Sequence, residues 1–93
     1  MREITGEREL TFTVNSDETV CVKYDGYRRF TVLNNTSGNL KISGTGDFTT
    51  KYFIIPVGSA YCDYIPNPQS KAERKSSIFI SPTDSGTVCI TAD

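Results

Sequence analysis

Few side chains in this chain could perform catalysis or bind a metal, and they are widely spaced. The sequence contains no histidine and three cysteines, Cys21, Cys62 and Cys89. Histidine is the usual general base and the usual partner that activates a cysteine thiolate, so both mechanisms lack an essential group. The cysteines also lack the tight spacing of zinc ligands. We therefore expect no metal site and no bound cofactor.

Carboxylates are the remaining side chains that could act as an acid–base pair. The candidates are Asp25, Asp47, Asp63 and Asp84. All of them lie in predicted turns or loops, where aspartate commonly hydrogen-bonds its own backbone. Asp63 fits a turn least well, but one carboxylate does not make a site. The sequence therefore indicates a protein that is not an enzyme.

The elements that must position any site are predicted to be β-strands, because apolar residues recur with a period of two. The inward-facing positions are expected to be Leu10, Phe12, Val14, Val20, Val22, Tyr24, Phe30, Val32, Leu40 and Ile42. An apolar run from Tyr52 to Ile55 predicts a strand covered on both faces. About seven short strands predict an all-β fold, an antiparallel β-sandwich or small barrel, as a single domain over residues 1–93.

Turn signals separate the predicted strands. Asp25-Gly26 between Tyr24 and Tyr27 predicts a two-residue hairpin, since both central positions need positive φ. The stretches "NNTSG" and "PTDSG" are also predicted turns, and the second would join the last two strands as a hairpin. "SGTGD" resembles a phosphate-binding loop only superficially, because it lies between two strands and opens no helix.

Two of the cysteines lie between apolar β-branched neighbours, in "TVCVKY" and "GTVCIT". This setting favours small, semi-buried hydrophobic side chains. A disulfide between Cys21 and Cys89 is the alternative, provided that their strands are neighbours. The same side chains add apolar character to outward-facing positions, which favours an oligomer that covers them.

Charge and composition exclude several classes of partner. Ten basic and eleven acidic residues give a formal net charge of −1, so we expect no attraction to nucleic acid or to an anionic membrane. No stretch approaches the roughly 20 apolar residues of a membrane span. The charged N-terminus lacks the apolar region of a signal peptide, so we expect synthesis in the cytoplasm.

Residues 55–77 depart from the strand pattern. They contain Pro56, Pro66 and Pro68, which favour a long loop. Ser70 and Glu73 have the spacing of a capping box and predict a single helical turn. One interpretation is a crossover between two sheets. The other is a protein-contact loop, because tyrosine, arginine and rigid proline commonly anchor interfaces. The predicted contact residues are Tyr61, Tyr64, Lys71, Arg74 and Lys75.

Three stretches carry a resemblance to a known group of proteins. Phe30 to Asn35 form a strand with an Asn-rich end, Leu40 to Ile42 a short "nLkI" strand, and Ile54 to Gly58 an "I-x-P-x-G" corner. This pattern resembles the small β-sandwich proteins of tailed-bacteriophage virions, such as capsid decoration proteins, head-fibre bases and tail-associated modules. The resemblance implies a structural protein of the virion, made in the host cytoplasm, that binds capsid or tail subunits or itself as a trimer.

Two other functions remain open. A monomeric immunoglobulin-like or carbohydrate-binding module would expose Tyr24, Tyr27, Tyr61 and Tyr64 in one plane. The absence of tryptophan weakens this hypothesis. A small inhibitor or adaptor would act through residues 55–77. Self-association separates these hypotheses from the virion protein, which should be oligomeric or require its lattice.

Overall fold

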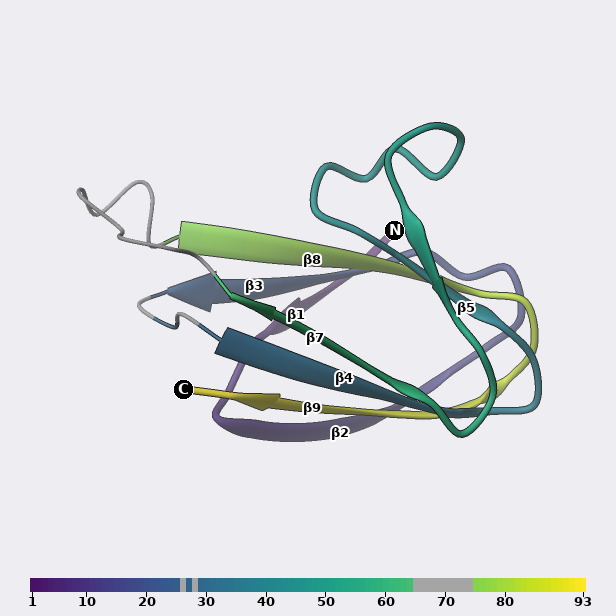
Figure 1. The fold of residues 1–93 in the computed structure, drawn as a ribbon, viewed down its shortest axis with the longest axis horizontal. Helices are drawn as coiled ribbons and strands as arrows, with labels where there is room; N and C mark the ends of the chain where they lie inside the picture. Colours follow the sequence, from purple (N-terminus) through teal and green to yellow (C-terminus); the bar gives the residue numbers. More distant parts are fainter. Residues whose placement is uncertain (26, 28, 65–74) are drawn as a thin grey trace.

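The structure is a computed structural model that describes residues 1–25, 27, 29–64 and 75–93. These residues form nine strands and no helix (Figure 1). The strands are β1 (Arg2–Thr5), β2 (Glu9–Val14), β3 (Val20–Asp25), β4 (Arg29–Thr36), β5 (Leu40–Ser43), β6 (Phe53–Ile55), β7 (Ala60–Tyr64), β8 (Lys75–Pro82) and β9 (Gly86–Ala92). The all-β fold class is confirmed, and β1 and β7 add to the strands that the sequence pattern predicts.

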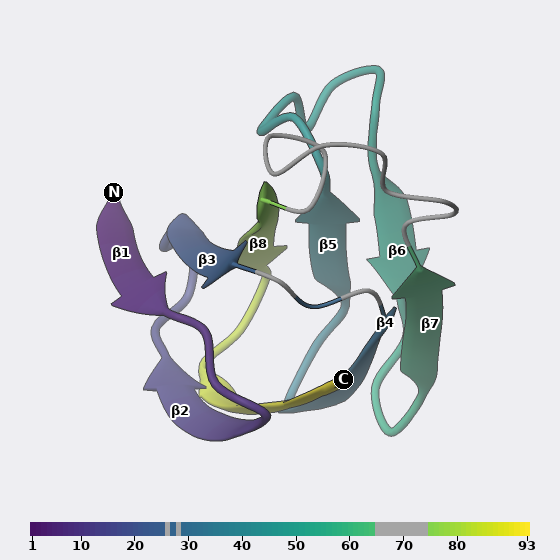
Figure 2. The ribbon, with the colours of Figure 1, turned by 90° about the vertical axis from the view of Figure 1, so that its left-hand side faces the viewer.

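The strands form a five-stranded sheet of order β1-β3-β8-β5-β6 and a four-stranded sheet of order β2-β9-β4-β7. The antiparallel pairs are nested: β5 pairs with β6, β4 with β7, β3 with β8 and β2 with β9. This arrangement is one long hairpin rolled up into a sandwich, which is the topology of a jelly roll. β1 adds a parallel strand beside β3. Figure 2 shows β1 and β2 on one flank and β6 and β7 on the other.

The nested pairing overturns two predicted hairpins. β3 and β4 lie in different sheets, so Asp25-Gly26 does not join a hairpin, and Gly26 itself lies outside the described residues. β8 and β9 also lie in different sheets, so "PTDSG" connects the sheets. Turn residues indicate where the chain reverses, but they do not determine which sheet the next strand joins.

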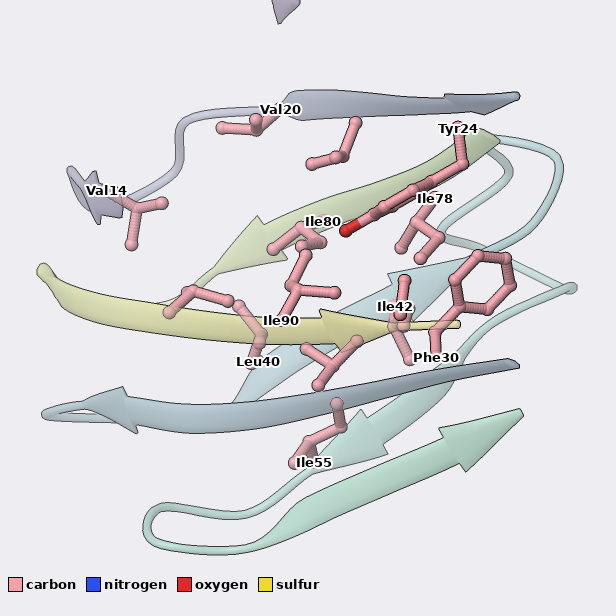
Figure 3. Packing of buried hydrophobic residues seen from close by; sticks show 14 residues of the cluster. Val14, Val20, Tyr24, Phe30, Leu40, Ile42, Ile55, Ile78, Ile80 and Ile90 are labelled. Carbon is pink, nitrogen blue, oxygen red and sulfur yellow. The ribbon is translucent and has the colours of Figure 1, made fainter. Parts of the chain in front are cut away.

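The core lies between the two sheets (Figure 3). Most of the predicted inward-facing residues are buried: Val14, Val20, Val22, Tyr24, Phe30, Val32, Leu40 and Ile42. The other two, Leu10 and Phe12, are partly buried and pack against this core. The prediction for β6 is wrong, because Phe53 is 60% and Ile54 52% exposed. β6 is an edge strand, so only Ile55 reaches the interior.

The cysteines are free thiols, and Cys21 and Cys89 belong to different sheets. The disulfide alternative is therefore wrong for this structure. Cys89 is partly buried, as a semi-buried hydrophobic residue should be. Cys21 is 2% exposed within a single chain, so its burial requires no second subunit. No helix in the described part of the chain is long and apolar enough to cross a membrane.

Candidate protein-contact site

The connection between β6 and β7 is a tight turn that carries an apolar side chain at its tip. The Ser59 N–H donates to the Pro56 carbonyl at 3.0 Å, and Gly58 has φ of 76°. A β-turn with positive φ at its third residue is of type II, where glycine is favoured. Val57 occupies the second position and is 54% exposed. The predicted corner at Ile54 to Gly58 is thus a turn from one sheet to the other.

Asn34 fixes this turn from inside the sandwich. Its side-chain amide donates to the Ile55 carbonyl at 2.8 Å and to the Gly38 carbonyl at 2.9 Å. Its backbone accepts from the Gly58 N–H at 2.8 Å and donates to the Ser59 carbonyl at 3.0 Å. Asn34 is fully buried in β4, so it joins the four-stranded sheet to β6 of the other sheet.

The sequence prediction of a turn at "NNTSG" is therefore wrong at its first residues. β4 continues to Thr36, and the Asn34 Oδ1 accepts from the Thr36 backbone N–H at 2.9 Å and from its hydroxyl at 2.6 Å. Asparagine is favoured in turns because its side chain can satisfy nearby backbone groups. Here the side chain of Asn34 instead satisfies backbone groups at the end of strand β4.

An aromatic pair bridges the two sheet edges beside the turn. The rings of Phe53 on β6 and Tyr61 on β7 stack at 5.3 Å between centroids. Tyr61 is half-buried and packs against the core, whereas Phe53 is mostly exposed. Phe53, Ile54, Pro56 and Val57 together form an exposed surface that we call the apolar corner.

The stretch that carries the apolar corner is free of charge. Residues 53–62 contain no charged side chain. The opposite flank, formed by β1 and β2, carries Arg2, Glu3, Glu7, Arg8 and Glu9. Charged side chains are a common protection of sheet edges against pairing with other chains. Residues 53–62 lack this protection and expose large apolar side chains, which makes this stretch a candidate contact surface.

The predicted contact residues fall into three groups. Tyr61 lies beside the apolar corner. Tyr64 ends β7 and Lys75 begins β8, so these two belong to different sheets. Lys71 and Arg74 lie outside the described residues, as do Pro66, Pro68 and the capping-box pair Ser70 and Glu73.

Residues 55–77 are therefore more than a loop. They contain β7, which pairs with β4, and they carry the chain from the five-stranded sheet to the four-stranded sheet and back. The crossover interpretation is confirmed. Sequence reasoning missed Phe53, Ile54 and Val57, although Pro56 directly after a short apolar run is a signal of an edge strand.

A shallow, open depression of about 850 Å³ lies on the outer face of the four-stranded sheet. Its side chains include Arg8, Glu9, Arg29, Thr31, Cys62, Thr91 and Asp93. Arg29 donates to both oxygens of Asp93, at 2.9 and 2.7 Å. This hydrogen bonding and the charge of Asp93 raise the pKa of Arg29, so the pair stays ionised. The depression has both signs of charge and no described group poised to transfer a proton.

The turn interpretation of "SGTGD" holds at Asp47. Its carboxylate accepts from the hydroxyls of Thr49 and Thr50, both at 2.6 Å, and from their backbone N–H groups. These hydrogen bonds hold the pKa of Asp47 well below its usual range. Asp47 is thus an ionised turn residue and is unsuited to act as a general acid.

The tyrosine plane expected of a carbohydrate-binding module does not form. Tyr24 is 2% exposed and its ring packs against Tyr27 at 5.4 Å and Phe30 at 5.1 Å. Burial, with a smaller effect of Tyr27, raises the pKa of Tyr24. Figure 3 shows its hydroxyl pointing into the core, where it has no hydrogen-bond partner among the described residues.

Comparisons with known proteins bear on the fold. Neither a protein-family model nor a curated protein matches the sequence. Among solved structures, the chain is similar to a de novo designed double-stranded β-helix determined by solution NMR, with a TM-score of 0.66. The two are 18% identical over 94% of this chain and 100% of the designed one. This likeness establishes a double-stranded β-helix fold, in agreement with the nested strand pairing.

Proposed function

We propose that this chain is a non-enzymatic assembly protein that binds other protein subunits through its β6–β7 flank. The observation that carries the proposal is the apolar corner: Phe53, Ile54 and Val57 are each more than half exposed, in the stretch 53–62 that has no charged side chain. Apolar surface of this kind costs free energy in water, which burial against a partner would recover.

The local geometry supports a preformed contact surface. The Asn34 hydrogen bonds and the type II turn fix the backbone that presents Val57. A preformed surface loses little conformational entropy on binding. Tyr64, Lys71, Arg74 and Lys75 remain predicted contact residues, and their basic side chains would contact an acidic rim of the partner.

The partner that we propose is a capsid or tail subunit of a tailed-bacteriophage virion. The resemblance at Phe30 to Asn35, Leu40 to Ile42 and Ile54 to Gly58 suggests this setting. Jelly rolls occur in viral capsid domains, but the same fold also serves unrelated functions. The support for this part of the proposal is therefore the sequence pattern.

Site-specific photo-crosslinking tests the proposal. A photoreactive amino acid replaces Val57, and a second protein carries it at Glu7, an exposed position between β1 and β2. Both proteins are irradiated in the cells or particles in which the protein is made. We expect a discrete adduct with a different protein from position 57 and none from position 7.

A matched pair of variants shows whether the apolar corner drives the contact. Phe53→Ser with Ile54→Ser should abolish the adduct from position 57, whereas Glu7→Ser with Arg8→Ser should leave it unchanged. Urea unfolding of each variant confirms that the chain remains folded. Equal adducts from both positions, or an adduct that survives the loss of Phe53 and Ile54, would contradict the proposal.

A further inference from the structure

β1 is held to the sandwich by few apolar contacts. In the described part of the chain it pairs only with β3, as a parallel strand at the edge of the five-stranded sheet. Of its four residues only Ile4 is partly buried and packs against the core. The ion pair between Glu3 and Lys23, at 3.1 Å, is more than half exposed and contributes little. Low apolar burial at a sheet edge is typical of segments that open while the rest of a protein stays folded.

The Arg2 side chain fastens β1 across the flank between the two sheets. Its Nη2 donates to the Thr13 carbonyl at 2.6 Å, and its guanidinium lies 5.8 Å from the centroid of the Phe12 ring. Nη2 is also 3.0 Å from the Glu18 Oε1, an ion pair whose geometry gives no hydrogen bond. One exposed-ended side chain of β1 thus makes the contacts that reach β2 and the β2–β3 connection.

Gly6 directly follows β1 and lies against the Tyr24 ring. Its N–H donates to the Lys23 carbonyl at 2.6 Å. A Cβ at this position would come within 2.6 Å of the Tyr24 Cζ, the atom that carries the hydroxyl. A residue without a side chain is therefore needed here, and Gly6 helps to keep Tyr24 at 2% exposure.

Two buried side-chain atoms among the described residues have no hydrogen-bond partner, and both adjoin β1. One is the Tyr24 hydroxyl, on the ring that Gly6 covers, and the other is the Glu18 Oε1 beside Arg2. A buried polar group without a partner costs free energy that hydration recovers. The closed position of β1 carries this cost, and the departure of β1 relieves it.

We infer that β1 is a strap that opens and closes on an otherwise intact sandwich. In the open state the contacts of Arg2 and Gly6 break and water reaches the Tyr24 hydroxyl, while β3 keeps its antiparallel partner β8. Opening also frees the edge of β3, and free strand edges are templates for pairing with other chains. β1 therefore guards this edge. It lies on the flank opposite the apolar corner (Figure 2), so the strap goes beyond the proposed function and does not depend on it.

Hydrogen exchange followed by nuclear magnetic resonance tests the strap in the full chain. The reporters are the backbone amides of residues 2 and 6, which donate to the Thr19 and Lys23 carbonyls. Relative to intrinsic rates, they should exchange roughly 100-fold or more faster than the slowest amides of the β3–β8 ladder. Their exchange should depend little on urea, because opening of β1 exposes little surface. Exchange at residues 2 and 6 that matches the β3–β8 ladder in rate and urea dependence would overturn the inference.

Gly6→Ala and Tyr24→Phe should change the opening of β1 in opposite directions. The methyl group of Gly6→Ala meets the Tyr24 ring and should speed exchange at residue 2 about tenfold or more. Tyr24→Phe removes the hydroxyl that gains water on opening and should slow exchange at residues 2 and 6 about tenfold. Gly44→Ala is the matched control and should leave exchange unchanged, because a Cβ there meets nothing within 4 Å. Exchange that Tyr24→Phe leaves unchanged, or that Gly6→Ala fails to speed, would also overturn the strap.

Discussion

Asn34 is the residue whose replacement should test the structure most sharply. Asn34→Ala removes the amide that contacts Ile55 and Gly38 and the oxygen that contacts Thr36. The Gly38 carbonyl retains a donor, because the Thr36 hydroxyl lies 2.8 Å away and no longer donates to the Asn34 oxygen. The Ile55 carbonyl and the Thr36 N–H lose the side chain that satisfies them.

Each buried group left without a partner costs about 1–3 kcal/mol, so Asn34→Ala should lower the free energy of unfolding by about 2–6 kcal/mol. This is a large part of the roughly 5–15 kcal/mol available to a domain. The assay is urea unfolding followed by far-ultraviolet circular dichroism, with tyrosine fluorescence as a second probe. Asn35→Ala is the matched control, since Asn35 is exposed and, among the described residues, its side chain makes one weak hydrogen bond, to the Cys89 Sγ at 3.9 Å.

Asn34→Asp adds a test by pH. The carboxylate keeps the acceptor but loses both donors, and burial among carbonyl oxygens raises the pKa of the new side chain above its unfolded value of about 3.9. A raised folded pKa gives stability that is present below the unfolded pKa and is lost as pH rises. The variant should therefore be least stable at neutral pH and recover partly in acid, relative to Asn34→Ala. A loss below about 1 kcal/mol for Asn34→Ala would refute the assigned role.

Three further changes have defined outcomes. Tyr24→Phe should raise the unfolding free energy measured in urea by up to about 2 kcal/mol, because the buried hydroxyl has no partner among the described residues. A loss of stability would mean that the hydroxyl is hydrogen-bonded in the folded protein. Gly86→Ala should lower the melting temperature by more than 10 °C, roughly the effect of a loss of 2–3 kcal/mol in unfolding free energy. The reason is that Gly86 has φ of 152° and that a Cβ there would meet the Thr36 backbone. A change of the melting temperature within 2 °C, roughly the assay error, would contradict this packing. The Asp47→Asn variant should have a lower unfolding free energy than the parent at neutral pH, and this difference should shrink below about pH 4. The reason is that the pKa of Asp47 is depressed in the folded state, so the stability that its charge contributes is lost as pH falls. A difference in unfolding free energy that is independent of pH would show that the charge of Asp47 does not contribute.

The sequence predicts which side chains enter the core better than it predicts which strands pair. Val20, Val22, Phe30 and Val32 are inward-facing as their alternation predicts, because burial depends on residues two apart in one strand. Pairing depends on strands far apart in the chain. Local turn signals such as Asp25-Gly26 therefore cannot reveal that β3 pairs with β8.

The candidate site was predictable in part. Tyr61 stood out in the sequence, but its neighbour Phe53 comes from an apolar run that is equally typical of a buried strand. The position of β6 at the sheet edge decides between burial and exposure, and that position follows only from the nested topology. Asn34 was missed for a similar reason, since its buried partner Ile55 belongs to the other sheet.

The nested pairing also determines the order in which the chain can fold. β5 and β6 are close in sequence and can pair early, whereas β2 must wait for β9, with Glu9 opposite Thr91. Such distant contacts require the closure of long loops and make folding slow. Because β9 lies between β2 and β4, a nascent chain leaves one edge of β4 unpaired on the ribosome until residues 86–92 have emerged. Synthesis of this protein should therefore be the stage most vulnerable to aggregation, and slowing translation before β9 should not help it fold.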